Sequence, residues 1–444
     1  MFAQQVLFVL GTKGFVLLSG VLTSVILARG LGARGLGVYT AVFAVVHIIL
    51  SLADLGVRQA ITYTMGQQLY RDEDVVSNVL VLLVASSVIS VTAAAIVFAT
   101  GPARGYGINV LVPAVASIPL LLFCTYTRGV SLAKGWIHRF NGADLIQQSV
   151  FVISLLFLVL VWKAGVIGAT VSYFSGATAA ALFSFGILKA VAPIRLRVTG
   201  AIIGHIGSLG IQYAANLFVL TLNYRLGVLL LERLMTVEDV GIFAVGVRFA
   251  ELLWQLPAAV GVVLFSRSAR AVSVREAVAR TALVLRILFP AMAAGGLILY
   301  VLAPMLLSVL FGREFISAVA PTRYLIPGVV VAIIFKVIYQ DLAGRGHPLA
   351  GTGIIFMIAA TNILCGLLLI PKLGINGAAI AASVSYMAGA IAFLYMYSRR
   401  EGIPTRDLIL LKPSDIQFIR AKINRRGGEL PGSAGMSISS TEGI

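Results

Sequence analysis

The sequence predicts an all-α polytopic membrane protein, with about 12 transmembrane helices in two pseudo-symmetric six-helix bundles around a central cavity. Three observations support this prediction. Hydrophobic residues make up 59% of the 444 residues and charged residues only 11%, whereas soluble domains carry about 25% charged residues, and the mean hydropathy is +1.00. Twelve apolar stretches have the length that a bilayer requires, and the second six repeat features of the first six.

Each apolar stretch is long enough to cross the hydrocarbon core of a membrane, for which about 20 mostly apolar residues are needed. The expected spans of the first half are 3–27, 37–63, 75–100, 108–128, 144–162 and 165–188. Those of the second half are 203–231, 240–265, 281–303, 323–342, 349–370 and 374–397. The first span is too long for a signal-peptide core and no small-residue cleavage site follows it, so we expect it to be retained.

The basic residues lie mainly in alternate loops. The net charge is +17. With the N-terminus in the cytoplasm, and with Arg128 and Arg323 at span ends counted in the adjoining loops, the cytoplasmic loops and tail hold 20 Lys and Arg and the opposite loops hold 8. This asymmetry follows the positive-inside rule. It predicts a membrane protein with both termini cytoplasmic, and it explains the basic composition through topology and membrane lipids, without a nucleic-acid partner.

Short matches between the halves indicate an internal repeat. Gly37-Val38-Tyr39 recurs as Gly241-Ile242-Phe243, and the run that begins Gly165-Val166-Ile167-Gly168-Ala169 recurs from Gly374, 209 residues later. A looser match relates Leu132–Gly135 to Leu342–Gly346. Repeats of six helices keep the same topology. We therefore expect a bundle over residues 1–190, a second over 191–398, and a basic, disordered cytoplasmic tail over 399–444.

Several polar and charged residues fall inside the expected spans, where insertion costs about 2.5–3.5 kcal/mol for each charge. Such groups face other helices or water, so we expect them to line the cavity. The cations predicted to bind substrate are Lys13, Arg58, Arg225, Arg248 and Lys336. The polar or ion-coupling candidates are His47, Asp54, Gln212, Asn216, Asn223, Glu251 and Gln255. A mainly cationic interior predicts a pathway for an anion.

A purely structural interpretation remains open for part of this set. Asp54 and Arg58 are four residues apart, and Arg248 and Glu251 three, so each is a possible ion pair that only holds helices together. Arg225 lies almost opposite the polar stripe of its own helix, so it either pairs elsewhere or extends to the surface. The sequence shows no nucleophile elbow, P-loop or zinc-ligand spacing, which predicts neither an enzyme nor a metal or cofactor site.

Five segments resemble the polysaccharide flippases of the O-antigen and exopolysaccharide type. They are Ile26–Gly32 with Gly37–Tyr39, Asp54–Gly56, Val240–Glu251, Pro327–Lys336 with Leu342–Gly346, and Pro371–Ala379. This family belongs to the superfamily of multidrug/oligosaccharidyl-lipid/polysaccharide exporters. Many relatives carry an acidic residue in helix seven near Gly227, which this chain lacks, so an ion-coupling role at that position is in doubt.

The resemblance implies alternating access that moves an undecaprenyl-diphosphate-linked oligosaccharide from the inner to the outer leaflet for polysaccharide biosynthesis. The lipid-linked anionic oligosaccharide is then the partner, with a polysaccharide polymerase and glycosyltransferases as further candidates. Two alternatives stay open. A cation-coupled multidrug exporter needs acidic residues deep in its lobes, which the excess of cations disfavours. A lipid-linked peptidoglycan-precursor flippase shares the cationic cavity but typically has two further helices.

Overall fold

The computed structural model describes residues 2–415 apart from 55, 101–105, 192–197, 270, 348 and 414, and these residues contain no β-strand. The helices of the first half are α1 (Phe2–Asp54), α2 (Val57–Gly66), α3 (Asp72–Thr100), α4 (Ile108–Ala133), α5 (Ile137–Leu155), the π-helical turn η1 (Leu156–Val161) and α6 (Gly165–Val191). The second half starts with α7 (Gly200–Leu234), α8 (Val237–Glu251), the 3-10 turn η2 (Leu252–Trp254), α9 (Gln255–Ala269) and α10 (Val274–Phe311). It continues with η3 (Arg313–Ala318), α11 (Val319–Val331), α12 (Ile333–Gly344), α13 (Thr352–Leu373), α14 (Ile375–Glu401) and α15 (Thr405–Ile409).

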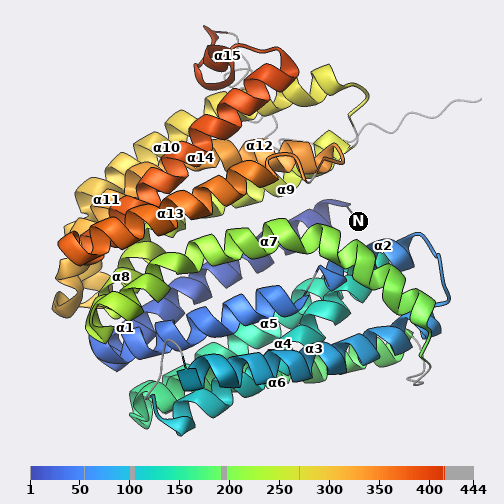
Figure 1. Ribbon diagram of the computed structural model, residues 1–444, viewed down its shortest axis with the longest axis horizontal. Helices are drawn as coiled ribbons and strands as arrows, with labels where there is room; N and C mark the ends of the chain where they lie inside the picture. Colours follow the sequence, from blue (N-terminus) through green and yellow to red (C-terminus); the bar gives the residue numbers. More distant parts are fainter. Residues whose placement is uncertain are drawn as a thin grey trace, which may run out of the picture.

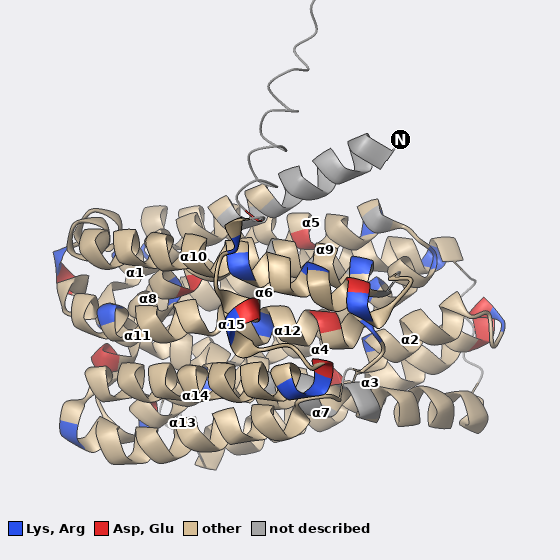
Figure 2. Ribbon diagram, turned by 90° about the horizontal axis from the view of Figure 1, so that it is seen from above, with Lys and Arg blue, Asp and Glu red and all other residues tan. Residues whose placement is uncertain are grey.

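The expected polytopic all-α membrane fold is confirmed. Ten helical segments of the described residues are long and apolar enough to cross a membrane. Large apolar side chains also point outward, as they do where lipid replaces water. Examples with more than half of the side chain exposed are Ile96, Leu182, Leu297, Leu364 and Ile391. Figure 2 shows α13 and α14 almost free of charge along their length, with charged positions near their ends. The exact count of twelve spans stays a prediction.

The predicted break between the first two spans is observed, because Gly32 has a non-helical backbone with φ 65° and ψ 179° and divides α1 into two helical arms that meet at a kink. Two predicted spans are interrupted in the structure. The second span breaks at Gly56, which has a left-handed backbone with φ 64°. The eighth span is interrupted by η2, because Pro257 has no N–H to continue the α-helical hydrogen bonding through that turn.

The backbone confirms the sequence repeat at the glycines that end or begin helices. Gly165 and Gly374, which begin the last long helix of each half, have φ values of 59° and 58°. Gly135 and Gly346, which follow α4 and α12, have φ values of 69° and 82°. A residue with a side chain rarely adopts these conformations. The two halves therefore share helix breaks as well as sequence.

Two large apolar clusters form the core. One is built mainly from α1 to α6 and also contains Ile202 and Ile206 from the start of α7. The other is built mainly from α8 to α14 and contains Val228 and Leu231 from the end of α7. Figure 1 shows α7 running between the two groups of helices, which converge where α1 meets α8 and diverge toward the opposite end. The domain boundary at residues 190 and 191 stays a prediction.

The converging end is joined by contacts between backbones. A Cβ atom on Gly37 of α1 would lie 1.8 Å from the carbonyl oxygen of Val237, and one on Gly241 of α8 would lie 2.0 Å from that of Ala33. The glycines that the repeat pairs therefore each contact the other half. Any larger side chain at these positions would force α1 and α8 apart.

Side chains at helix ends strengthen the same junction. Arg29 of α1 donates hydrogen bonds to the carbonyl oxygens of Val309 and Leu310 at the C-terminal end of α10, at 2.9 Å in the case of Leu310. Glu314 of η3 accepts a hydrogen bond of 2.7 Å from the backbone N–H of Ala33, just after the α1 kink. A cation at a helix C-terminus and an anion at an N-terminus are both favoured by the helix dipole. We call these contacts the junction latch.

Candidate functional site: a cavity between the two halves

A cavity of about 250 Å³ lies where helices of the first half face α7 and α8. The residues from the first half are Gly20, Thr23, Leu27, Tyr39, Thr40, Phe43 and His47 of α1, Gln147, Gln148 and Phe151 of α5, and Tyr173 of α6. The second half contributes Arg225 of α7 and Arg248 of α8. We call this space the arginine cavity.

Two arginines are the only charged side chains among the lining residues, apart from the titratable His47. The Nη1 atom of Arg248 donates a hydrogen bond of 3.2 Å to the Ser24 hydroxyl, and neither arginine has an ion-pair partner within 4 Å among the described residues. Their like charges repel each other. Because no carboxylate lines the cavity, an anion placed between the arginines would relieve that repulsion.

Arg225 was predicted to be one of the cavity cations, with pairing elsewhere or extension to the surface as the open alternative, and it lines the arginine cavity. The alternative assumes one regular helix with the polar stripe of α7 as its only inward face. The cavity lies at the junction of the halves, so α7 presents one side to it and another to its own bundle. Asn223, two residues earlier, accordingly faces α13, where its side-chain oxygen accepts a hydrogen bond of 3.0 Å from Asn362.

Beside the arginine cavity, the second half holds a small pocket of about 20 Å³, enough for a water molecule. Its polar lining consists of Asn223, Tyr224, Glu251, Trp254, Asn362 and Tyr386. The positive charges of Arg225, Lys336 and Arg248 attract the Glu251 carboxylate. When all four groups are ionised, this region carries an excess of two positive charges.

Lys336 is held by aromatic side chains. Its ammonium donates a hydrogen bond of 2.9 Å to the Tyr224 hydroxyl and lies 3.9 Å from the centre of the Trp254 ring. The ring is fixed in turn, because Trp254 Nε1 donates a hydrogen bond of 2.9 Å to the carbonyl oxygen of Val329. This cation–π cage gives Lys336 a partner inside the second half. It does not line the arginine cavity.

Asp54 and Arg58 do not line the arginine cavity either. The helix break at Gly56 turns α2 away from the face that carries Thr40 and His47, so the expectation that Asp54 and Arg58 line the same cavity as His47 does not hold for this cavity. One Asp54 carboxylate oxygen is buried without a hydrogen-bond partner among the described residues. No Asp54–Arg58 or Arg248–Glu251 pair is found within 4 Å in the described part of the chain.

The remaining predicted residues do not add to the cavity. Gln255 is exposed at the start of α9, because η2 intervenes between it and Glu251. The side chains of Lys13, Gln212 and Asn216 lie outside the described residues, so their roles stay predictions. The described His, Cys, Asp and Glu side chains form no cluster able to hold a metal ion.

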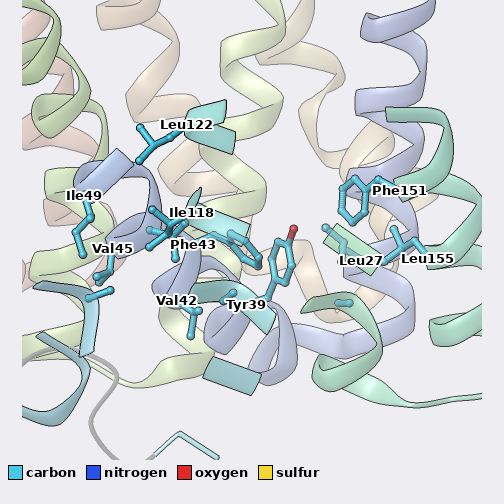
Figure 3. Close-up of a cluster of buried hydrophobic side chains, with 14 of the residues drawn as sticks. Leu27, Tyr39, Val42, Phe43, Val45, Ile49, Ile118, Leu122, Phe151 and Leu155 are labelled. Atoms are coloured by element: carbon cyan, nitrogen blue, oxygen red, sulfur yellow. The ribbon is translucent and has the colours of Figure 1, made fainter. Parts of the chain in front are cut away.

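Sequence reasoning missed the aromatic wall of the cavity. The rings of Tyr39 and Phe43 are 4.5 Å apart between centroids, and those of Phe43 and Tyr173 are 4.4 Å apart. Figure 3 shows the Tyr39 ring beside that of Phe43, with Phe151 and Leu27 on its other side. Aromatic residues in a membrane helix give no signal that separates a cavity wall from lipid contact. The four-residue spacing of Tyr39, Phe43 and His47 was the one available indication.

Comparison with known proteins identifies the family. The family described as "Polysaccharide biosynthesis protein" matches residues 26–320, well over half of the chain. The chain belongs to this family. The expected relationship is therefore confirmed, although no curated protein matches the chain.

Solved structures show which fold this chain resembles. An inward closed structure of the lipid II flippase MurJ is similar over 96% of this chain and 94% of its own, with a TM-score of 0.74 and 14% identity. An inward-facing multidrug resistance MATE transporter of the MOP superfamily is similar over 87% and 95%, with a TM-score of 0.71 and 17% identity. A MOP superfamily transporter from Pyrococcus furiosus with a binding pocket of reverse polarity follows at 0.65 and 15% identity, over 88% and 94%.

These similarities confirm the fold of MOP-superfamily transporters and do not assign a substrate. The MurJ match spans nearly all of that chain. The expected difference of two helices therefore does not by itself separate this chain from a peptidoglycan-precursor flippase.

Proposed function

We propose that this protein moves an undecaprenyl-diphosphate-linked oligosaccharide across the bacterial inner membrane by alternating access, for the synthesis of a surface polysaccharide. The observation that carries the proposal is the pairing of Arg225 and Arg248 in one cavity whose lining contains no carboxylate. A lipid diphosphate has about two to three negative charges, which hydrocarbon excludes. The excess of two positive charges around the arginine cavity is opposite in sign and similar in size to the charge of the diphosphate.

The position of the cavity fits the proposed mechanism. It is lined by both halves of the chain, as a site must be if it is exposed alternately by rocking one half against the other. The closed junction at the α1 kink, which the positive-inside rule assigns to the outer side, leaves the cytoplasmic side as the side of entry in this state. Outward movement of an anion is also favoured by a negative-inside potential, by about 2.3 kcal/mol per charge per 100 mV.

Two other functions are less well supported by the cavity. A multidrug exporter for cationic compounds would place two arginines against its substrate. A peptidoglycan-precursor flippase would use the same diphosphate chemistry, so a direct comparison of substrates must separate it from our proposal. The family description favours polysaccharide biosynthesis.

The test measures surface glycan and membrane abundance together for Arg225→Gln, Arg248→Gln and the charge-preserving Arg248→Lys. At 5 Å and an effective dielectric constant of about 20, losing one compensating charge costs about 3 kcal/mol. We therefore expect each glutamine variant to lower export roughly 100-fold at normal abundance, while Arg248→Lys retains a large part of it.

The control is Arg34→Gln, because Arg34 is exposed and forms only a long ion pair of 3.6 Å with Glu238. Wild-type export by both glutamine variants would rule out the arginine cavity as the anion path. Rescue of a strain that lacks its peptidoglycan-precursor flippase, with no effect on surface glycan, would favour the alternative substrate.

A further inference from the structure

The last long helix of each half carries a cation stacked on an aromatic ring near its C-terminal end. The Lys189 ammonium of α6 lies 4.7 Å from the centre of the Phe185 ring, and the guanidinium carbon of Arg399 in α14 lies 5.3 Å from the centre of the Tyr395 ring. Both helices have 27 residues, and the cation and the ring each recur 210 residues later in the sequence. The repeat therefore preserves these two stacked cations, which we call the interfacial pairs.

Both interfacial pairs lie on outward faces of their helices. On α6 the exposed fraction is 70% for Leu182 and 42% for Phe185, and on α14 it is 67% for Ile391 and 57% for Tyr395. Residues three or four apart share one face of a helix, so each cation stands at the end of an exposed apolar stripe. Figure 1 places α6 and α14 in different groups of helices. Each half thus has its own stripe, which ends in a cation.

The protein supplies no counter-charge to either cation. Neither Lys189 nor Arg399 has a carboxylate within 4 Å in the described part of the chain, whereas Lys134, at the C-terminal end of α4, pairs with Asp72. The positive-inside rule, which assigns all three helix ends to the cytoplasm, requires only the charge and not a ring beneath it. Aromatic rings favour the border between hydrocarbon and headgroups. Stacking therefore holds each unpaired cation at the depth of the lipid phosphates.

A phospholipid has the chemistry that complements an interfacial pair. Its phosphate supplies the negative charge that the cation lacks, and its acyl chain covers the apolar stripe that continues from the ring into the membrane. Inorganic phosphate would leave this stripe uncovered. A zwitterionic headgroup carries its own ammonium, which competes with the protein cation for the phosphate. An anionic headgroup has no such competitor, and basic residues at the inner leaflet attract anionic lipids.

We propose that α6 and α14 each bind one anionic phospholipid of the inner leaflet at repeat-related sites. The headgroup phosphate contacts Lys189 or Arg399, and an acyl chain lies along the stripe that contains Leu182 or Ile391. This inference does not depend on the proposed function, because neither site lines the arginine cavity. Each half keeps its own contact with the leaflet when the halves rotate relative to each other.

The experiment is native mass spectrometry of the full-length protein, titrated with phosphatidylglycerol or with phosphatidylethanolamine of the same acyl chains. We expect two molecules of phosphatidylglycerol to bind more tightly than any phosphatidylethanolamine. Lys189→Gln and Arg399→Gln should each weaken one of the two sites about five-fold, the effect of one basic residue near an anionic leaflet. The double variant should weaken both. Phe185→Leu keeps the cation and the apolar stripe, so it should weaken one site only about two-fold.

The matched control is Arg275→Gln, because Arg275 is exposed on the same predicted side and contacts no aromatic ring or carboxylate among the described residues. It should leave both sites unchanged. The inference is wrong if phosphatidylethanolamine binds as tightly as phosphatidylglycerol. It is equally wrong if Arg275→Gln weakens binding as much as Lys189→Gln does, because general surface charge would then account for the lipid. Displacement of the lipid by inorganic phosphate would show that the acyl chain contributes nothing, and would also contradict it.

Discussion

At the scale of single residues, the structure separates cations that face the cavity from cations that serve the scaffold. Arg286 belongs to the second group. It forms a two-pronged contact with the Asp415 carboxylate, at 2.6 and 3.0 Å, and a hydrogen bond of 2.7 Å to the carbonyl oxygen of Asp407. These contacts fasten the segment after α14 onto α10. Arg286 therefore serves to hold the C-terminal segment in place.

We expect Arg286→Gln to lower the melting temperature of the purified protein by several degrees, because it leaves the buried Asp415 carboxylate without its cation, at a cost of about 2 kcal/mol. Asp415→Asn should lose a similar amount. The double variant should lose clearly less than the two single losses added together. Additive losses in this double-mutant cycle would mean that the two side chains do not interact.

The same pair predicts a pH dependence. The Arg286 hydrogen bond holds the pKa of Asp415 below its usual value. A group with a lower pKa in the folded state stabilises the protein above its unfolded pKa of about 4. That stabilisation is lost as the pH falls through the folded pKa. Acidification from pH 5 to pH 3 should therefore destabilise the wild type more than Asp415→Asn, as measured by melting temperature.

The sequence predicts that Lys336 binds substrate, whereas the structure shows its ammonium bound within the protein. Its ammonium is bound to Tyr224 and stacked on Trp254, so we expect Lys336→Met to lower glycan export by less than Arg248→Gln does. The remaining effect would act through Glu251, whose negative charge loses one of three cations. An equal or larger loss of export in Lys336→Met, at normal abundance, would place its ammonium on the substrate path.

At the scale of helices, the crossing of α1 and α8 depends on two glycines. We expect Gly37→Ala to lower the melting temperature and the membrane abundance, because its Cβ would overlap the Val237 carbonyl oxygen at 1.8 Å, and overpacking costs about 1–3 kcal/mol. Gly204→Ala in α7 is the matched control, since nothing lies within 4 Å of its Cβ; alanine there should be neutral or slightly stabilising. Equal behaviour of the two variants would show that the backbones are not in contact.

The helices also show which features of the fold can be predicted from the sequence alone. Apolar length predicts the spans, and the repeat predicts the glycine breaks at Gly165 and Gly374, because both are local properties. Side-chain direction was predicted less well. Position inside an expected span placed Arg58 in the cavity, although the helix break at Gly56 turns α2 away, and helical periodicity left the direction of Arg225 open. A single left-handed residue or a crossing at an angle changes the direction of every later side chain, and no periodicity in the sequence reports either.

At the scale of the whole molecule, this state has one closed end, and the latch residues Arg29 and Glu314 come from different halves. With Cys124 and Cys365 replaced by alanine, a cysteine at Thr40 probes access to the cavity. We expect an impermeant thiol reagent to label it in inside-out vesicles and not in right-side-out vesicles.

Adding Arg29→Gln and Glu314→Gln should increase labelling in right-side-out vesicles, because both contacts at helix ends lose their charge. Adding Arg34→Gln instead should change nothing, since its ion pair is long and exposed. Labelling that is equal from both sides in all variants would mean that the junction is not a barrier.

The crossing of α1 and α8 at Gly37 and Gly241 also acts as a pivot, at which a small rotation of one half produces a large displacement at the far end of its helices. A spanning helix of about 25 residues is about 38 Å long, so rotation of one half about a crossing near one end by about 15° displaces the far end by about 10 Å. The atoms at the crossing itself barely move. Such a pivot opens a wide passage on one side of the membrane while breaking few contacts on the other. It therefore lets a bulky headgroup enter at little cost, and leaves the larger energy barrier to the opposite movement, in which the pivot itself must separate.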